Sequence, residues 1–166
     1  MLKNLQQRGD TIVEVLIVVI VIATVIGSAY SIAVKSLQST QRTQERSYAL
    51  KLAETQLERL KAASTGANAA SVLAVTQSFC LDATLTKTLN TIGSSLPSLN
   101  NDDFSRYNAN CISYPSGSSD CASYCYYTSL LQTAGGSFDK SYTASVRWDG
   151  PNGNRQQVQL SYKVYQ

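Results

Sequence analysis

The chain has 166 residues, enough for one domain with an anchor or a tail. Its net charge of +3 is too small to indicate a polyanion-binding surface by itself. The sequence contains no histidine, which removes the commonest general base and the commonest metal ligand. No serine or cysteine nucleophile therefore has a histidine to activate it, and no lysine stands near a serine at a persuasive spacing. We expect no enzymatic activity, no cofactor and no metal site.

Residues 15–34 contain no charged side chain and predict a membrane-spanning helix. A helix of this length extends about 30 Å, which matches the hydrocarbon core of a bilayer. Lys3 and Arg8 precede the segment, so the positive-inside rule keeps the N-terminus in the cytoplasm and sends the C-terminal part across the membrane. A secretory signal cut near Ala29 or Ala33 is the alternative, but such signals have a shorter apolar region, of about 7–15 residues.

An acidic residue, Glu14, stands directly before the apolar run. An ionised carboxylate within a bilayer is costly, so it is rare unless it has a partner or a task. The alternative interpretation is that Glu14 reaches the membrane interface and has no further role.

The residues around Glu14 form a specific pattern. A short basic leader ends in Gly9, and Asp10-Thr11-Ile12-Val13-Glu14 leads into the apolar run. This pattern resembles the type III signal of type IV prepilins and pseudopilins. The resemblance implies that a prepilin peptidase cuts between Gly9 and Asp10 on the cytoplasmic side, which makes Glu14 the fifth residue of the mature chain. The family usually has phenylalanine directly after the cut, often N-methylated, so Asp10 puts N-methylation in doubt.

The resemblance also implies a task for Glu14. Cleavage would create a positively charged amine at Asp10, and in a bundle of such helices Glu14 of one subunit would pair with the amine of its neighbour. A buried carboxylate without its partner costs several kcal/mol, which would favour the correct register between subunits.

The helix is expected to continue well beyond the membrane. No glycine or proline occurs between Gly27 and Gly66, so one helix is predicted from about residue 11 to about residue 63. The segment "YALKLAETQLERLK" looks like the equivalent part of PilV-like minor pilins. A coiled coil is the alternative for this half, but its heptads are short and irregular. A narrow stripe at helical spacing predicts the face that packs on a small domain: Ala49, Ala53, Gln56, Leu57 and Leu60.

The end of the chain predicts a β-hairpin. "SYTASVRW" and "RQQVQLSYKVY" both alternate, and "DGPNGN" between them is a strong turn signal. The hairpin also resembles the last hairpin of PilV-like minor pilins, and its apolar face is expected to cover the second half of the long helix. That face comprises Tyr142, Ala144, Val146 and Trp148 in the first strand, and Val158, Leu160, Tyr162 and Val164 in the second.

The middle of the chain gives weaker signals. We expect a short helix over residues 82–92 with Asp82 as its cap, and short strands over residues 111–114 and 122–130. Aspartates at 102–103 and the loop at 149–154 lack the ligand count and spacing of a calcium site, so turns are expected there.

Four cysteines lie in the C-terminal half, and their even number beyond a membrane span predicts disulfide bonds in an oxidising compartment. Zinc is the alternative, although the spacing is not that of a zinc knuckle. Three pairings are possible, and the sequence does not choose among them. The four residues are Cys80, Cys111, Cys121 and Cys125.

A second alternative concerns nucleic acid, because some pilus systems take up DNA and the C-terminal half is rich in tyrosine. Stacked aromatics with basic residues can bind a single strand. The basic residues here are too few and too balanced by acids to form a groove: Lys140, Arg147, Arg155 and Lys163. Nucleic acid is therefore a possible but unfavoured partner.

Together these features predict an α+β protein with the type IV pilin fold, in which a long N-terminal helix packs on a small antiparallel β-sheet. Its expected parts are a leader (residues 1–9), a membrane and polymerisation helix (10–35), an amphipathic continuation (36–65) and a disulfide-bonded globular β domain (66–166). The expected function is a structural subunit of a type IV pilus or related filament, a minor pilin by its resemblance, held in the bilayer first and on the cell surface after assembly. Its expected partners are other pilin subunits, the prepilin peptidase and the inner-membrane assembly platform. A pseudopilin of a type II secretion or DNA-uptake apparatus, and a single-pass anchored binding ectodomain, are the alternatives.

Overall fold

The computed structural model describes residues 7–66, 69–74, 77–90, 104–113, 125–135, 139–150 and 153–165, with the backbone alone at residues 7–11, 105, 134 and 135. The chain divides into two compact units, residues 1–43 and 44–166. The protein is α+β, as expected: it has a long N-terminal helix with an apolar first half, and a small antiparallel sheet.

Helix α1 (Gln7–Thr65) begins earlier than the sequence predicted and ends close to the expected residue. Its last carbonyl groups are satisfied locally, because the hydroxyl of Ser64 donates to the carbonyl of Lys61 and that of Thr65 donates to Ala62. The amide of Gly66 then donates to the carbonyl of Ala63. These bonds replace the partners that the last turn of a helix lacks, and the helix stops there.

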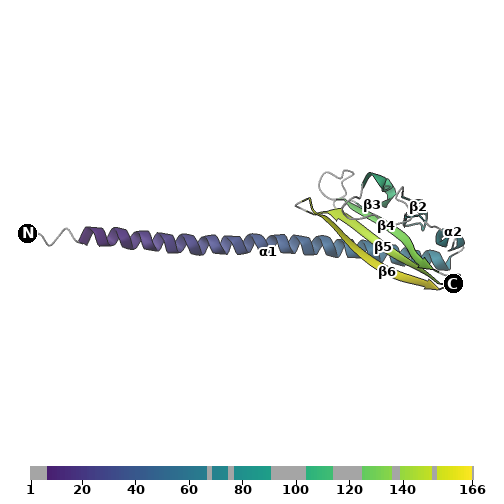
Figure 1. Cartoon of the computed structure of the whole chain (residues 1–166), viewed down its shortest axis with the longest axis horizontal. Helices are drawn as coiled ribbons and strands as arrows, with labels where there is room; N and C mark the ends of the chain where they lie inside the picture. The colour runs from purple at the N-terminus through teal and green to yellow at the C-terminus, as the bar shows by residue number, and fades with distance from the viewer. Residues whose placement is uncertain are drawn as a thin grey trace, which may run out of the picture. The chain divides into compact units, whose positions relative to one another are not determined.

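The second unit contains a six-stranded sheet in the order β2-β1-β4-β5-β6, with β3 paired to β4 (Figure 1). Every pairing is antiparallel. The hairpin of β5 and β6 forms as the sequence predicted, and its turn is closed by the amide of Gly150 on the carbonyl of Asn154. The strands are β1 (Phe79–Leu81), β2 (Lys87–Leu89), β3 (Ile112–Ser113), β4 (Tyr126–Gly135), β5 (Asp139–Asp149) and β6 (Arg155–Tyr165).

The core of this unit lies between the sheet and the part of α1 that belongs to it. Ala49, Ala53 and Leu60 are fully buried there and pack with the predicted apolar face of the hairpin. The small alanines allow the helix backbone to come close to the sheet. The predicted stripe is thus confirmed as the packing face, with Leu57 at its half-buried margin.

Strand β5 differs from the expectation of one apolar and one solvated face. Its alternate residues Thr143, Ser145 and Arg147 are also buried, at 6%, 0% and 2% exposure. The adjacent segment explains part of this burial, because Phe104 in η1 (Phe104–Arg106) stacks on Tyr127 of β4 with 4.1 Å between ring centroids. β5 therefore lies inside the sheet, between β4 and β6, with polar side chains buried on its second face.

The helix expected over residues 82–92 does not form in the described part of that range. Asp82 does not cap a helix: its carboxylate accepts hydrogen bonds from the amides of Thr84 and Thr86. The chain is thereby held in a turn, and the residues that follow, Lys87–Leu89, pair with β1 as strand β2. Residues 91 and 92 lie outside the described residues.

Strand β4 was expected over residues 122–130, but it extends to Gly135 because β5 begins early enough to pair with it there. The pairing continues past a register shift between Gln132 and Ala134. Strand β3 is shorter than predicted. Residues 122–124 and 114 lie outside the described part of the chain.

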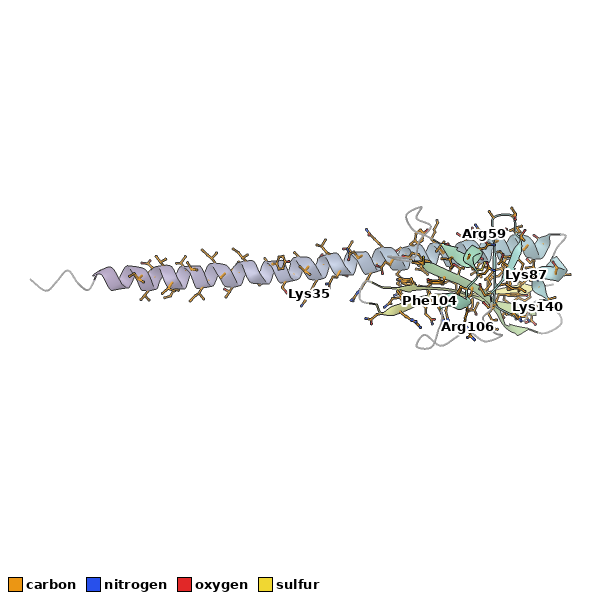
Figure 2. The ribbon with its side chains drawn as sticks, turned by 90° about the horizontal axis from the view of Figure 1, so that it is seen from above. Lys35, Arg59, Lys87, Phe104, Arg106 and Lys140 are labelled. Atoms are coloured by element: carbon orange, nitrogen blue, oxygen red, sulfur yellow. A yellow bond between two sulfur atoms is a disulfide. The ribbon has the colours of Figure 1, made fainter. Side chains whose placement is uncertain are left out.

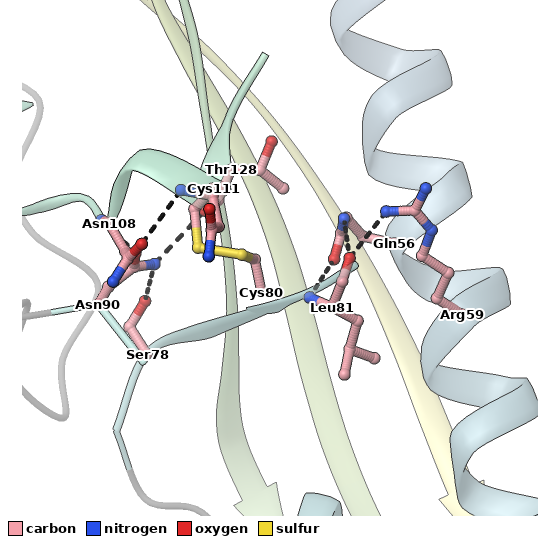
Figure 3. Close-up of a disulfide and its surroundings, with 10 residues drawn as sticks. Gln56, Arg59, Ser78, Cys80, Leu81, Asn90, Asn108, Cys111 and Thr128 are labelled. Carbon is pink, nitrogen blue, oxygen red and sulfur yellow. Dashed lines mark hydrogen bonds between the residues drawn. A yellow bond between two sulfur atoms is a disulfide. The ribbon is translucent and has the colours of Figure 1, made fainter. Parts of the chain in front are cut away.

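Gln56, a polar member of the helix stripe, fixes the helix to the end of strand β1 (Figure 3). Its side-chain amide donates to the carbonyl oxygen of Leu81 at 2.9 Å, and its oxygen accepts from the amide of Leu81 at 3.0 Å. Arg59 donates to the same carbonyl at 2.7 Å. Both backbone polar atoms of the buried residue Leu81 are thus satisfied by one turn of α1.

Replacing Gln56 by alanine leaves the buried amide of Leu81 without its acceptor, so the free energy of unfolding should fall by about 1–3 kcal/mol. Urea unfolding of the detergent-solubilised chain, followed through the fluorescence of the buried Trp148, measures this loss. Gln44→Ala on the exposed surface of the same helix is the matched control. Equal stabilities of the two variants would contradict the role given to Gln56.

Candidate functional site

The most unusual surface of the protein is the apolar part of α1 in the first unit. From Ile12 to Leu37 the large apolar side chains project from the helix (Figure 2), and all of them are 49–72% exposed except Val34, which is half-buried. Soluble proteins rarely expose a continuous apolar surface of more than a few hundred Å². The helix is long and apolar enough to cross a membrane. This surface therefore needs a cover of lipid or of other protein helices.

The residues predicted to act in processing and assembly lie at the start of this helix. Gly9 and Asp10 have helical backbone, and the structure does not describe the side chain of Asp10. Glu14 is exposed, and no ion pair is found for it among the described residues. The structure thus places all three on one continuous helix, with a carboxylate at the edge of the apolar surface.

Hydroxyl groups within the apolar part are satisfied by the helix itself. Thr24 donates to the carbonyl of Val21 and Ser28 donates to that of Val25, both at 2.8 Å. These bonds remove the cost of placing an unpaired hydroxyl donor in an apolar environment. Gly27 lies in open space, since a Cβ built there would meet nothing within 4 Å. Close approach of another helix at this position is sterically free.

Two of the predicted disulfide cysteines are joined to each other. Cys80 of β1 is bonded to Cys111 of η2 (Ala109–Cys111), and both residues are buried (Figure 3). Cys125 is also disulfide-bonded, and Cys121 lies outside the described residues. Among the described residues, no group of three or more His, Cys, Asp or Glu side chains could hold a metal ion. Cys80 and Cys111 are therefore not zinc thiolates, and their bond links β1 to the segment that precedes β3.

A buried asparagine, which the sequence analysis missed, organises the same region. The side-chain amide of Asn90 donates to the hydroxyl of Ser78 and, at 3.4 Å, to the carbonyl of Thr128. Its oxygen accepts from the amide of Asn108, directly before η2. A polar residue in a loop gives no sequence signal of this kind, because all three partners are distant in sequence.

The four basic residues considered for nucleic-acid binding already have partners within the second unit. Arg147 is buried, and Lys140 donates to the carbonyl of Leu73 at the end of α2 (Ala69–Leu73). Lys163 pairs with Asp139, and Arg155 lies over the ring of Phe104 near Asp149. They hold strands and rings in place instead of lining one open groove.

Among the described residues of the second unit, three groups have shifted pKa values. Hydrogen bonds from Thr84 and Thr86 lower the pKa of the Asp82 carboxyl. The hydrogen bond and charge of Asp139 raise the pKa of Lys163. Burial raises the pKa of the Tyr142 hydroxyl from 10.0 to about 12. The same buried hydroxyl donates a hydrogen bond to the carbonyl of Leu73. All three shifts follow from contacts that stabilise the fold.

Comparisons of the chain with protein-family models, with curated proteins and with solved structures found no match. The functional assignment therefore rests on the residues of this chain: the exposed apolar helix, the acid at its front edge and the disulfide-bonded sheet domain.

The raised pKa of Tyr142 predicts an alkaline limit of stability. The folded chain holds the phenol proton of Tyr142 more tightly than the unfolded chain does. The contribution of this proton to the free energy of unfolding is therefore complete below pH 10 and is lost as the pH rises towards 12. Tyr142→Phe should make stability fall less steeply across this window in urea unfolding at stepped pH. Tyr165→Phe, at an exposed position, should follow the wild-type curve. Identical pH slopes for Tyr142→Phe and the wild type would refute the assignment.

Proposed function

We propose that this protein is a structural subunit of a type IV pilus or a related filament, in which copies of the chain pack against one another. The observation that carries the proposal is the exposed apolar helix with Glu14 at its front edge, directly behind a leader that ends in Gly9. In this proposal the fold is the type IV pilin fold, and α1 is both the membrane anchor and the polymerisation element.

The proposed sequence of events begins in the bilayer. The leader stays in the cytoplasm, the apolar part of α1 spans the membrane, and the disulfide-bonded domain folds on the oxidising side. A prepilin peptidase hydrolyses the peptide bond between Gly9 and Asp10, which frees the leader and leaves an amine on Asp10. The inner-membrane assembly platform then moves the subunit from lipid into the filament on the cell surface.

The exposed apolar side chains support this exchange of surroundings. Lipid and a bundle of identical helices are both apolar, so the helix can leave one for the other without entering water. In the bundle, the carboxylate of Glu14 is neutralised by the amine of a neighbouring subunit. The same residues suit a pseudopilin of a secretion or DNA-uptake apparatus. An anchored ectodomain that never polymerises would give Glu14 no partner.

Processing is tested by co-expressing the chain with a prepilin peptidase and measuring its intact mass. Residues 1–9 should be removed, and Gly9→Val should block the cut because a larger side chain then stands at the scissile bond. Gly27→Val, at a position with open space around it, should be processed normally. A retained leader, or a cut near Ala29, would favour an anchored or secreted protein.

Assembly is tested by Glu14→Ala. Insertion into the membrane should be unchanged, while the amount of the chain in sheared surface filaments should fall at least about tenfold, equivalent to about 1.4 kcal/mol. Glu54→Ala, at an exposed acid of the same helix in the second unit, is the control. Mutant chain at the normal level in filaments would count against the role of Glu14.

A further inference from the structure

The charges at the front of the processed helix do not cancel. This inference rests on the proposed cut after Gly9, which leaves an amine, the carboxylate of Asp10 and the carboxylate of Glu14 within five positions. One positive and two negative groups leave a surplus negative charge on every subunit. In a bundle of apolar helices an unneutralised charge is expensive, so the surplus calls for a further cation.

The next charged residue along the helix is Lys35, at the far end of the apolar run. Its side chain is exposed on the helix (Figure 2), and no ion pair is found for it among the described residues. With Lys35 included, the charges from the new amine to the end of the apolar run sum to zero.

Glu14 and Lys35 lie on the same side of α1. They are three heptads apart, so they occupy the same position in a pair of helices that wind around each other with 3.5 residues per turn. Most of the polar residues between them fall on this side as well, since Thr24, Ser28 and Ser31 precede Lys35 at spacings of four and three residues. The hydroxyls of Thr24 and Ser28 are satisfied within the helix, so this polar side can enter an apolar bundle.

The axial distance between the two charges matches the bilayer. Three heptads of helix extend about 31 Å, close to the roughly 30 Å thickness of the hydrocarbon core. When a subunit sits in the membrane with Glu14 at the cytoplasmic boundary, its Lys35 lies at the outer boundary. A subunit already displaced outward by one membrane thickness brings its own Glu14 to that same level.

We propose that Lys35 of one copy forms an ion pair with Glu14 of a second, parallel copy displaced outward along the helix axis by about 31 Å. Lys35 is then a second partner of the Glu14 carboxylate beside the amine, and it balances the extra acid that Asp10 introduces. The pair fixes the axial register of neighbouring subunits, because other displacements leave Lys35 against apolar side chains without an acidic partner.

The first test compares Lys35→Gln with Lys51→Gln, which removes the same charge from an exposed position in the second unit. Lys35→Gln should lower the amount of chain in sheared filaments at least about tenfold, equivalent to about 1.4 kcal/mol, with leader removal and membrane level unchanged. Lys51→Gln should assemble normally. Equal filament amounts for the two variants would overturn the proposal, and would mean that Lys35 merely contacts lipid headgroups.

The second test measures the register directly. Val13 and Val34 neighbour the two charges and have the same separation. A chain carrying Val13→Cys and Val34→Cys should form a ladder of disulfide-linked multimers when its filaments are oxidised, and neither single variant should do so. The pair Val13→Cys and Ile26→Cys is the control for a wrong level. Filaments that give no ladder with Val13→Cys and Val34→Cys would also overturn the proposal.

These outcomes are separable from failure of the proposed function. If the wild-type chain keeps its leader or is absent from filaments, the filament assignment is wrong. If the wild type is processed and assembles, and Lys35→Gln does so equally well, the assignment stands and the Lys35 pairing alone is wrong.

Discussion

The central constraint on this protein is a helix whose apolar surface is exposed on all sides and carries a carboxylate at its edge. Water is a poor solvent for the side chains from Ile12 to Val34, and lipid is a poor solvent for an ionised Glu14. Only surroundings that are apolar and also supply a positive charge suit both. A bundle of parallel copies that supply the proposed amine and Lys35 would meet the two requirements together, which is the physical basis of the proposed filament.

In the second unit the same helix packs on a β-sheet. Its part of α1 buries one narrow face, built from small residues such as Ala49 and Ala53, so the sheet can lie close against it. Gln56 then satisfies both backbone polar atoms of Leu81, and the Cys80–Cys111 bond joins the same strand, β1, to η2. The short strands at this end of the sheet are thus held by specific bonds, whereas β5 and β6 are held mainly by long pairing and apolar burial.

The two units therefore divide the work that we propose. In this proposal the exposed helix interacts with lipid, with the assembly machinery and with other copies, and its chemistry is that of a few charges in an apolar setting. The disulfide-bonded domain keeps its basic residues in internal contacts, as with Lys140 on the carbonyl of Leu73 and Lys163 on Asp139. A structural subunit is consistent with this division, because its activity lies in contacts between copies and needs no reactive centre.

The sequence alone determined the features that depend on local pattern. The long helix, its buried stripe and the final hairpin follow from periodicity and turn chemistry within a few residues, whereas the candidate residues Gly9, Asp10 and Glu14 come from the resemblance of the leader to prepilin signals. Tertiary structure decided what depends on distant partners: the pairing of Cys80 with Cys111, the clamp of Gln56 on Leu81, the network of Asn90, and the burial of Arg147 on the second face of β5. It also turned the expected helix at Asp82 into a turn and a strand, because pairing with β1 stabilises an extended chain there. Hydrogen bonds and disulfides between residues far apart in the chain leave no periodic trace, so only the folded arrangement could show them.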